Sequence, residues 1–207
     1  TPPFFAGFVF RPAAPARALS GAAWATHFLK VLPLTKFSDL GLSEALLKAL
    51  AAKGYDKPTP IQAQGIPALL QGRDLCGIAQ TGTGKTAAFA LPSLQRMAAD
   101  PRPRQPGTCR MLVLAPTREL ASQIAQSFVD YGANLKLTVA VIFGGVPINR
   151  QIRQMGQGVD ILVATPGRLL DLIDQRALTL RNVEIFVLDE ADQMLDLGFI
   201  HALKRVH

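Results

Sequence analysis

The chain has 207 residues, enough for one globular domain and too few for two full α/β domains. A hydrophobic content of 49% with 18% charged residues excludes a disordered chain, and no apolar run reaches the roughly 18 residues of a membrane span, so we expect no membrane partner. The net charge of +7 is unevenly placed, because residues 1–36 carry +4 and residues 37–207 only +3. Bulk charge is therefore weak evidence for a nucleic-acid partner.

Residues 1–36 are rich in Ala, Pro and Phe and contain no acidic residue. This composition is compatible with an organelle transit peptide, although Ser20 is the only serine in it. Since no Met precedes Met97, a misassigned or non-native extension is the second interpretation. We expect residues 1–36 to be disordered or non-native, and the fold to occupy residues 37–207.

Two helices are predicted before the first strand. Ser43 can cap a helix that runs to about Lys53, and Gly54 suits its C-terminal stop. A second helix follows Pro60 and runs to about Leu70.

Beyond Leu70 the sequence alternates between short apolar runs and helical periodicity. The apolar runs lie at 74–79, 111–115, 137–143, 160–164 and 183–188. Helical periodicity fills 85–99, 118–131, 147–155, 167–175 and 193–205. This alternation predicts an α/β fold with a mostly parallel sheet sandwiched by helices. Ligands bind such sheets beyond the carboxyl ends of the strands, so the informative residues should follow the strands.

The two cysteines, Cys76 and Cys109, lie far apart in apolar stretches. We expect both to be reduced thiols in the core, without a disulfide between them.

A glycine-rich turn joins the run at 74–79 to the helix at 85–99, with the sequence Ala79-Gln80-Thr81-Gly82-Thr83-Gly84-Lys85-Thr86. Strand, glycine turn and helix are the context of a phosphate-binding loop. Gly82 and Gly84 let backbone N–H groups face an anion, and the helix directs its positive end to the same place. Lys85 can reach the β- and γ-phosphates, and Thr86 can ligate Mg²⁺. The pattern predicts a nucleoside triphosphate site, with a chance glycine turn as the alternative.

The last apolar run ends in three acids within four residues, Asp189-Glu190-Ala191-Asp192. Asp189 can hold Mg²⁺ directly or through water, and Glu190 can orient and deprotonate an attacking water. Phosphoryl transfer depends mainly on positioning and charge neutralisation, so these groups and Lys85 suffice as local parts. The alternative is an acidic helix N-cap.

Six motifs stand in the order of a known family. They are Gly54-Tyr55-Asp56-Lys57-Pro58-Thr59-Pro60-Ile61-Gln62, Ala79 to Thr86, Pro116-Thr117-Arg118-Glu119-Leu120-Ala121, Gly144-Gly145, Thr165-Pro166-Gly167-Arg168 and Asp189 to Asp192. Over residues 37–207 the chain resembles the first RecA-like domain of DEAD-box ATP-dependent RNA helicases, and it looks closest to the bacterial RhlE-type branch. The resemblance implies a RecA-like P-loop domain, truncated before its last strands, from a cytoplasmic ATP-hydrolysing helicase.

The resemblance also implies ATP and Mg²⁺ as cofactors. Gln62 is expected to hydrogen-bond the adenine edge and Phe37 to stack on the base, which would select ATP. The alternative for these two residues is a plain core or surface role. The expected nucleotide contacts are Phe37, Tyr55, Lys57, Thr59, Gln62, Thr81, Gly82, Thr83, Gly84, Lys85 and Thr86. The expected catalytic residues are Lys85, Asp189 and Glu190, with Thr86 and Asp189 as metal ligands.

Three patches that follow predicted strands are implied to grip the sugar-phosphate backbone of one RNA strand. They comprise Pro116, Thr117, Arg118, Glu119, Gly144, Gly145, Thr165, Pro166, Gly167 and Arg168. Arginines, hydroxyls and helix N-termini are suitable phosphate partners, and such contacts carry little sequence information. We therefore expect sequence-nonspecific RNA binding, with a structural salt bridge as the alternative role of Arg168.

The resemblance implies a further strand and a second RecA-like domain. Neither is found before His207. Loss of that strand would leave a gap of about 10 Å between the phosphate-loop strand and the acidic strand. We expect residues 37–207 alone to be poorly stable, unless residues 4–10 fill the slot. An arginine finger from the second domain would be worth about 10³–10⁵ in rate, so the fragment should hydrolyse ATP negligibly. A non-catalytic fragment that binds nucleotide or RNA, and a DNA helicase, stay open as alternatives.

Overall fold

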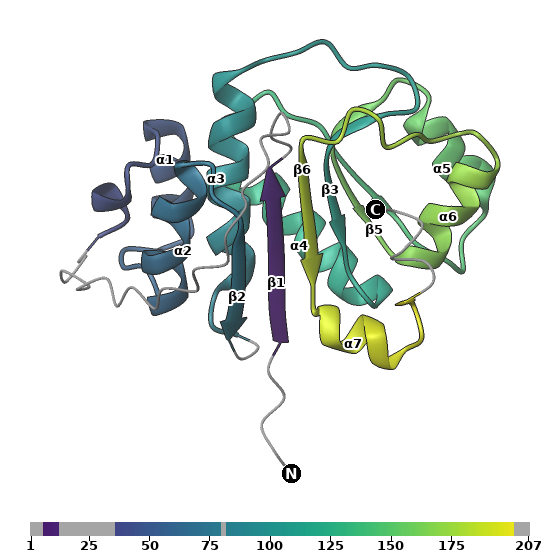
Figure 1. Ribbon diagram of the computed structural model, residues 1–207. Helices are drawn as coiled ribbons and strands as arrows, with labels where there is room; N and C mark the ends of the chain where they lie inside the picture. Colours follow the sequence, from purple (N-terminus) through teal and green to yellow (C-terminus); the bar gives the residue numbers. More distant parts are fainter. Residues whose placement is uncertain (1–5, 13–35, 80–81, 201–207) are drawn as a thin grey trace, which may run out of the picture.

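A computed structural model describes residues 6–12, 36–79 and 82–200. Its centre is a six-stranded sheet with the order β2-β1-β6-β3-β5-β4 (Figure 1). The strands are β1 Ala6–Pro12, β2 Leu75–Ala79, β3 Cys109–Leu114, β4 Val139–Ile142, β5 Val159–Ala164 and β6 Ile185–Asp189. The helices are the 3-10 turn η1 Phe37–Leu40, α1 Glu44–Ala52, α2 Pro60–Leu70, α3 Lys85–Ala99, α4 Arg118–Tyr131, α5 Ile148–Met155, α6 Pro166–Asp174 and α7 Ala191–Asp196.

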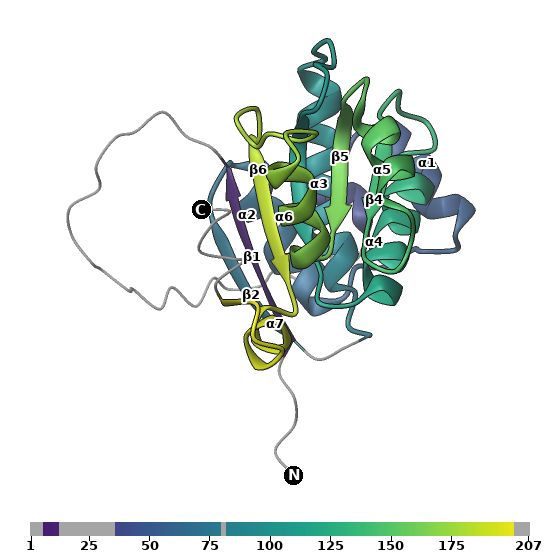
Figure 2. The ribbon, with the colours of Figure 1, turned by 90° about the vertical axis from the view of Figure 1, so that its right-hand side faces the viewer.

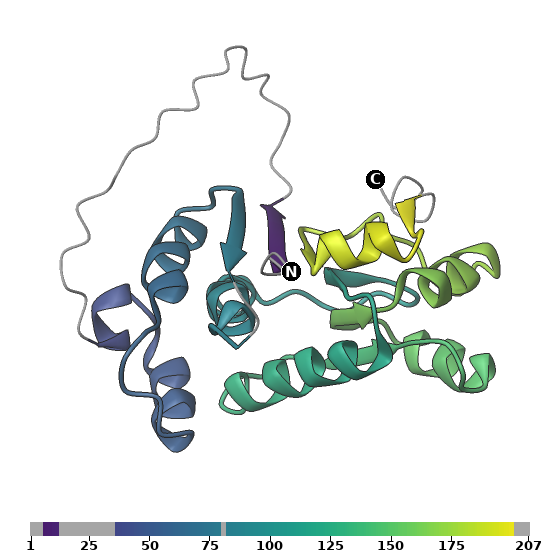
Figure 3. The same ribbon diagram turned by 90° about the horizontal axis from the view of Figure 1, so that it is seen from below.

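Helices cover both faces of the sheet (Figures 2 and 3). The side chains of β3 alternate between two apolar cores, because successive residues of a strand point to opposite faces. Met111 and Val113 belong to the core that includes residues of α1 to α4. Leu112 and Leu114 belong to the core that includes residues of α5, α6 and α7. The predicted α/β class, with a mostly parallel sheet between helices, is confirmed.

The alternating elements lie close to their predicted positions. Helices α3 and α4 have the predicted bounds, and the other strands and helices after Leu70 differ by a few residues. The last helix, predicted for 193–205, covers 191–196, and residues 201–207 lie outside the described residues. None of the described helices combines the length and apolar composition that crossing a bilayer requires.

Strand β1 occupies the slot between β2 and β6. It pairs antiparallel with both neighbours, with Phe8 opposite Gly77 on one side and Asp189 on the other. The remaining neighbouring pairs are parallel. This pairing agrees with the alternative in which the N-terminal segment fills the slot, and the expectation that residues 1–36 are disordered or non-native stays a prediction. Residues 1–5 and 13–35 lie outside the described residues.

The structure corrects the prediction that both cysteines are buried. Cys76 is exposed, because β2 lies at the edge of the sheet and presents Cys76 and Ile78 on the face opposite buried Gly77. Cys109 lies in the central strand β3 and is fully buried. Burial raises the pKa of its thiol to about 12, so only Cys109 has the expected inert environment.

Candidate functional site

The described part of the glycine-rich turn between β2 and α3 is Gly82, Thr83 and Gly84. Gly82 and Gly84 have φ of +80° and +87°, in the left-handed region that glycine adopts without steric cost. A Cβ on Gly84 would lie 2.3 Å from Nε2 of Gln62. Gly84 is therefore needed both for the turn and for the close approach of α2. Thr81 lies outside the described residues.

Lys85 is the first residue of α3 and is 7% exposed. Its Nζ donates a hydrogen bond of 2.7 Å to the carbonyl oxygen of Ala79, the last residue of β2. The ammonium group is thus held beside the glycine turn, where helix α3 directs its N-terminus. Thr86 follows in the same first turn of α3 and is partly exposed.

Asp189 is the last residue of β6 and is 2% exposed. Its Oδ1 accepts a hydrogen bond of 3.1 Å from the backbone N–H of Glu190. Burial raises the pKa of Asp189 to about 6, while the positive charge of Lys85 lowers it. This interaction means that the fold brings Lys85 and Asp189, which are far apart in sequence, into one site. A carboxylate desolvated to this degree favours a bound proton or cation.

Glu190 has φ of 52° and ψ of 50°, the left-handed region that non-glycine residues rarely adopt. Such a backbone costs about 1–2 kcal/mol, and strained residues of this kind cluster at functional positions. Glu190 occupies the N-cap position of α7, but its side chain makes no capping hydrogen bond. Its role in catalysis and its role as an acidic cap both stay predictions.

Gln62 connects α2 to the glycine turn. Its Oε1 accepts a hydrogen bond of 2.9 Å from the backbone N–H of Thr59, and its Nε2 donates one of 3.1 Å to the carbonyl oxygen of Gly84. The Oγ1 of Thr59 is buried in the capping box at the start of α2, where it faces the backbone N–H of Gln62. The groups of Thr59 and Gln62 beside the glycine turn are polar, which fits a polar ligand such as a nucleotide.

The other predicted nucleotide contacts lie in two different environments. Phe37 is 4% exposed and packs in the core with α1 to α4, so its stacking on a base stays a prediction. Tyr55 and Lys57 are exposed in the loop between α1 and α2. Thr83 is partly exposed inside the glycine turn.

Two of the predicted RNA patches meet in space. Thr117 caps α4, with its Oγ1 accepting a hydrogen bond of 3.2 Å from the N–H of Leu120. A Cβ on Gly145 would lie 2.5 Å from Nη1 of Arg118, so the glycine admits this guanidinium. Arg118 also lies over the ring of Phe143, 5.2 Å from its centroid. Pro116 is buried, and Glu119 is exposed in the first turn of α4.

The third patch is held by its own side chains. Nη1 of Arg168 donates hydrogen bonds of 2.9 Å to the carbonyl oxygen of Val146 and to Oε1 of Gln151. Its Nε donates to Asp171 at 3.3 Å. These contacts favour the structural alternative for Arg168. Thr165 is the buried N-cap residue of α6, Pro166 is buried, and Gly167 is exposed at the N-terminus of that helix.

The glycine turn, Thr117, Gly144-Gly145, Thr165 and Asp189 lie at or just after the ends of strands, along one edge of the sheet. Strands β3, β4, β5 and β6 are parallel, and β2 shares their direction because β1 is antiparallel to both β2 and β6. The arrowheads of β2 and β6 accordingly point to the same edge in Figure 1. We call this the carboxyl edge, meaning the side of the sheet at which the parallel strands end and not an edge strand. Open α/β sheets bind ligands at this edge. These residues follow the strands, which agrees with the position expected for the informative residues.

The residues at the carboxyl edge could bind Mg²⁺ together with phosphate groups of a ligand. Among the described residues no cluster of three or more His, Cys, Asp and Glu could hold a metal ion by itself. Mg²⁺ is usually bound by one or two protein oxygens together with substrate phosphates and water. The Asp189 carboxylate and the Thr86 hydroxyl are oxygen ligands of that kind, so they fit a metal held jointly with a phosphate chain.

Sequence reasoning missed the supporting residues. Phe143 stands directly before the predicted Gly144-Gly145 patch, but nothing in the sequence says that its ring will face Arg118. Gln151 is 4% exposed and joins Arg168 to the carbonyl oxygen of Phe143. The left-handed backbone of Glu190 had no signal either, because neighbouring residues do not specify it.

Comparison with known proteins gives three concordant results. A family model described as DEAD/DEAH box helicase matches residues 59–207. The chain is 47% identical over 174 residues to "DEAD-box ATP-dependent RNA helicase 20" of Oryza sativa subsp. japonica, covering 84% of this chain and 35% of that protein. It is 49% identical over 170 residues to "RNA helicase CrhR" of Synechocystis, covering 82% of this chain and 33% of that protein. The chain thus spans about a third of the length of these curated relatives.

Two solved structures share the fold. One is the RNA helicase Prp28 from Chaetomium thermophilum bound to ADP, with a TM-score of 0.75 and 41% identity, covering 83% of this chain and 42% of that one. The other is a DEAD box protein from Methanococcus jannaschii, with a TM-score of 0.71 and 38% identity, covering 83% of this chain and 46% of that one. These similarities confirm the expected fold class. They do not test the RhlE-type assignment.

Proposed function

Because the chain belongs to the DEAD/DEAH box helicase family, we propose that it forms part of an ATP-dependent RNA helicase. It would bind ATP and Mg²⁺ at the carboxyl edge, near the ends of β2 and β6, and a single RNA strand beside the ends of β3, β4 and β5. Hydrolysis of ATP by the whole protein would be coupled to local unpairing of an RNA duplex.

The observation that carries this proposal is the convergence of Lys85 and Asp189. The glycine turn supplies backbone N–H groups at the N-terminus of α3, Lys85 supplies a positive charge, and Asp189 supplies a buried carboxylate. A phosphate chain with a divalent cation satisfies both charges at once. The similar Prp28 structure contains ADP, which supports a nucleotide as the ligand.

Each residue would have a distinct task in hydrolysis. The turn and Lys85 would bind the β- and γ-phosphates, and Thr86 and Asp189 would hold Mg²⁺. Bound Mg²⁺ would neutralise the charge that develops on the phosphate oxygens. Glu190 would orient a water molecule and accept its proton as the water oxygen attacks the γ-phosphorus and the bond to the β-phosphate oxygen breaks.

RNA would be gripped through its backbone. Glu119 and Gly167 are exposed in the first turns of α4 and α6, where helix N-termini favour phosphate, and Arg118 offers a guanidinium held between Gly145 and Phe143. Backbone contacts position a strand without reading its bases, so RNA binding should be sequence-nonspecific. A cytoplasmic location, the RhlE-type branch and a second RecA-like domain as partner stay predictions.

The proposal is tested by nucleotide binding to the 207-residue chain. The affinity for a fluorescent ATP analogue should be measured with Mg²⁺ for the parent protein and for Lys85→Ala. We expect at least about tenfold weaker binding in the variant, since a charge-assisted hydrogen bond contributes about 1.5–3 kcal/mol. The matched control is Lys48→Ala, which removes an exposed lysine that forms an ion pair with Glu44 of the same helix. Equal affinities for the parent and K85A would contradict the proposal.

The alternatives differ in what they predict for catalysis. A non-catalytic fragment would bind nucleotide or RNA. A longer protein that contains it and has the full length of the relatives would then show no ATP hydrolysis. A DNA helicase would unwind DNA duplexes in preference to RNA duplexes. Phosphate release stimulated by RNA, and unwinding assays on matched RNA and DNA duplexes, distinguish the three functions.

A further inference from the structure

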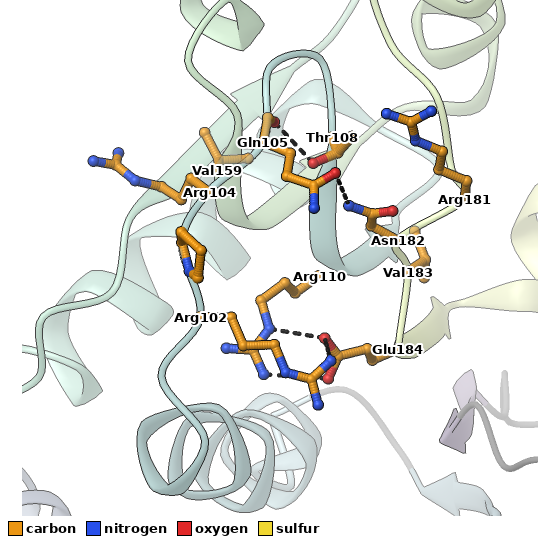
Figure 4. A pocket seen from close by; sticks show the side chains of 11 residues that line it. Arg102, Arg104, Gln105, Thr108, Arg110, Val159, Arg181, Asn182, Val183 and Glu184 are labelled. Carbon is orange, nitrogen blue, oxygen red and sulfur yellow. Dashed lines mark hydrogen bonds and ion pairs between the residues drawn. The ribbon is translucent and has the colours of Figure 1, made fainter.

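A cavity of about 450 Å³ opens at the edge of the sheet opposite the carboxyl edge (Figure 4). Its walls are the loop that leads from α3 into β3 and the loop that leads into β6. Val159, the first residue of β5, and Arg110, near the start of β3, also line it. The cavity is therefore separate from the proposed nucleotide and RNA sites, and no role assigned above uses it.

The inner wall of the cavity is a balanced ion-pair network. Arg110 is 8% exposed, and its Nε and Nη2 donate to the two carboxylate oxygens of Glu184 at 2.9 and 3.2 Å. Arg102 donates to the same carboxylate at 3.2 Å and forms a second ion pair with Asp100. Two guanidinium groups thus meet two carboxylates, and the network has no net charge.

The mouth of the cavity carries an excess of positive charge. Arg104 and Arg181 stand on the two facing loops, and both are exposed. Neither forms an ion pair with any residue that the structure describes. The inner network is balanced, so these two arginines add two positive charges beside the opening, although the Arg104 side chain extends away from the cavity in Figure 4. Exposed guanidinium groups can turn toward a ligand at little cost, because their side chains are long and flexible.

The two loops are fixed relative to each other before any ligand arrives. Nδ2 of Asn182 donates a hydrogen bond of 2.9 Å to Oε1 of Gln105 across the cavity (Figure 4). The N–H of Thr179 donates to the carbonyl oxygen of Gly107 at 2.8 Å. Gly158 has φ of +71°, and a Cβ there would lie 2.0 Å from the carbonyl oxygen of Gln105. Gly158 thus allows the first loop to pack against the start of β5. Together these contacts hold both loops in place, so the cavity is preformed.

We propose that this cavity binds a phosphate group, carried either by a small phosphorylated molecule or by an RNA strand. Guanidinium groups are suited to phosphate because their paired N–H donors match its oxygens. The amide groups of Gln105 and Asn182 add neutral hydrogen-bonding groups between Arg104 and Arg181. The volume lies in the range of small-molecule sites, roughly 300–1,000 Å³. Because the cavity and the carboxyl edge are at opposite ends of the strands, both can be occupied together, and this inference does not depend on the proposed function.

The test is a titration with inorganic phosphate followed through the amide NMR signals of the full chain. Saturating ADP and Mg²⁺ should be present, so that the glycine turn does not compete for the added anion. We expect concentration-dependent shifts at Gln105 and Asn182. The double variant R104Q/R181Q should bind phosphate about tenfold more weakly or not at all, as expected for the loss of charge-assisted hydrogen bonds. The control R73Q/K136Q removes two exposed cations outside the cavity lining and should retain the shifts.

A second titration with a single-stranded RNA oligonucleotide distinguishes the two sources. Shifts at the same two amides with RNA, lost in R104Q/R181Q, would identify an RNA backbone as the ligand. Shifts with inorganic phosphate but not with RNA would identify a small phosphorylated molecule. The proposal is overturned if neither probe moves these signals, or if R104Q/R181Q and R73Q/K136Q respond as the parent does.

Discussion

At the scale of one residue, Asp189 is a carboxylate that the fold removes from water. The residue ends a strand in the middle of the sheet, where burial excludes water and raises its pKa to about 6. Lys85 opposes that shift but does not cancel it. In the ligand-free protein, the folded state therefore holds this proton more tightly than the unfolded chain does. Its contribution to stability is largest in acid and falls as the pH rises from about 4 to about 6.

The same pKa predicts a pH dependence of ligand binding. A proton and Mg²⁺ compete for the Asp189 carboxylate, so the Mg²⁺-dependent part of ATP affinity should weaken below about pH 6, by about tenfold for each further pH unit. Calorimetric titrations of ATP between pH 5 and 8, with Mg²⁺ and with a chelator, would measure it. The affinity without Mg²⁺ should not show this step. A Mg²⁺ contribution that is constant across this range would contradict the assigned ligand.

Gly84 has a left-handed backbone and also lies close to Gln62. Substitutions at two glycines can separate the effects of these two features. Gly84→Ala must place a Cβ at φ +87° and against Nε2 of Gln62, so it should disturb both the turn and the bond from Gln62. Gly72→Ala faces a similar φ of +75°, but its closest neighbour is the flexible end of Arg96 at 3.5 Å. Both should lose about 1–2 kcal/mol of stability for the left-handed backbone. Only G84A should also weaken ATP binding, by about tenfold, because the bond that positions the turn is lost. Equal ATP affinities for the two variants would show that this contact is unimportant.

Local geometry was predictable from sequence only where a local motif carries it. Gly82 and Gly84, which have the left-handed backbone before Lys85, are such a case, and the roles of these residues stay predictions. The contacts of Arg168 with Val146 and Gln151 depend on how two separate segments pack, which no local pattern reveals. For the same reason the exposure of Cys76 was missed, because an apolar run does not say whether its strand is central or at an edge.

At the scale of elements, β1 is the part of the fold that sequence periodicity did not predict. Helix and strand positions after Leu70 follow from local spacing, and the structure places them accordingly. The position of β1 follows from the edges of β2 and β6, whose N–H and C=O groups need partners. Strand β1 precedes β2 and β6 in the chain and runs antiparallel to both. It supplies hydrogen-bond partners for their backbone groups. Long-range pairing of this kind is not visible in local sequence.

This arrangement makes a single backbone N–H in β1 important. Val9 lies opposite Cys76 on one side and Leu188 on the other. Val9→Pro removes one ladder hydrogen bond in the middle of the sheet and should cost about 1–3 kcal/mol of unfolding free energy. Val9→Thr keeps the N–H and the β-branched shape and serves as the control. Denaturant unfolding of the two variants would measure the difference, and indistinguishable midpoints would mean that β1 does not contribute to stability.

At the scale of the whole molecule, the sheet separates two ends with different chemistry. The carboxyl edge brings together the glycine turn, a buried carboxylate and the N-termini of α4 and α6. The opposite edge has the arginine-lined cavity. The fold class was predictable, and so was which loops meet beyond the carboxyl ends of the parallel strands. The cavity was not, since its arginines come from two loops and from β3, with no recognisable motif.

The central claim is that Lys85, Thr86, Asp189 and Glu190 surround one Mg²⁺-bound triphosphate. The most direct test is a crystal structure of the chain with Mg²⁺ and a non-hydrolysable ATP analogue. We predict the phosphates in the glycine turn within hydrogen-bond reach of Lys85 Nζ, and Mg²⁺ about 2.1 Å from the Thr86 hydroxyl and bonded to Asp189 directly or through one water. A triphosphate bound elsewhere, or a metal without Thr86 and Asp189 around it, would contradict the account.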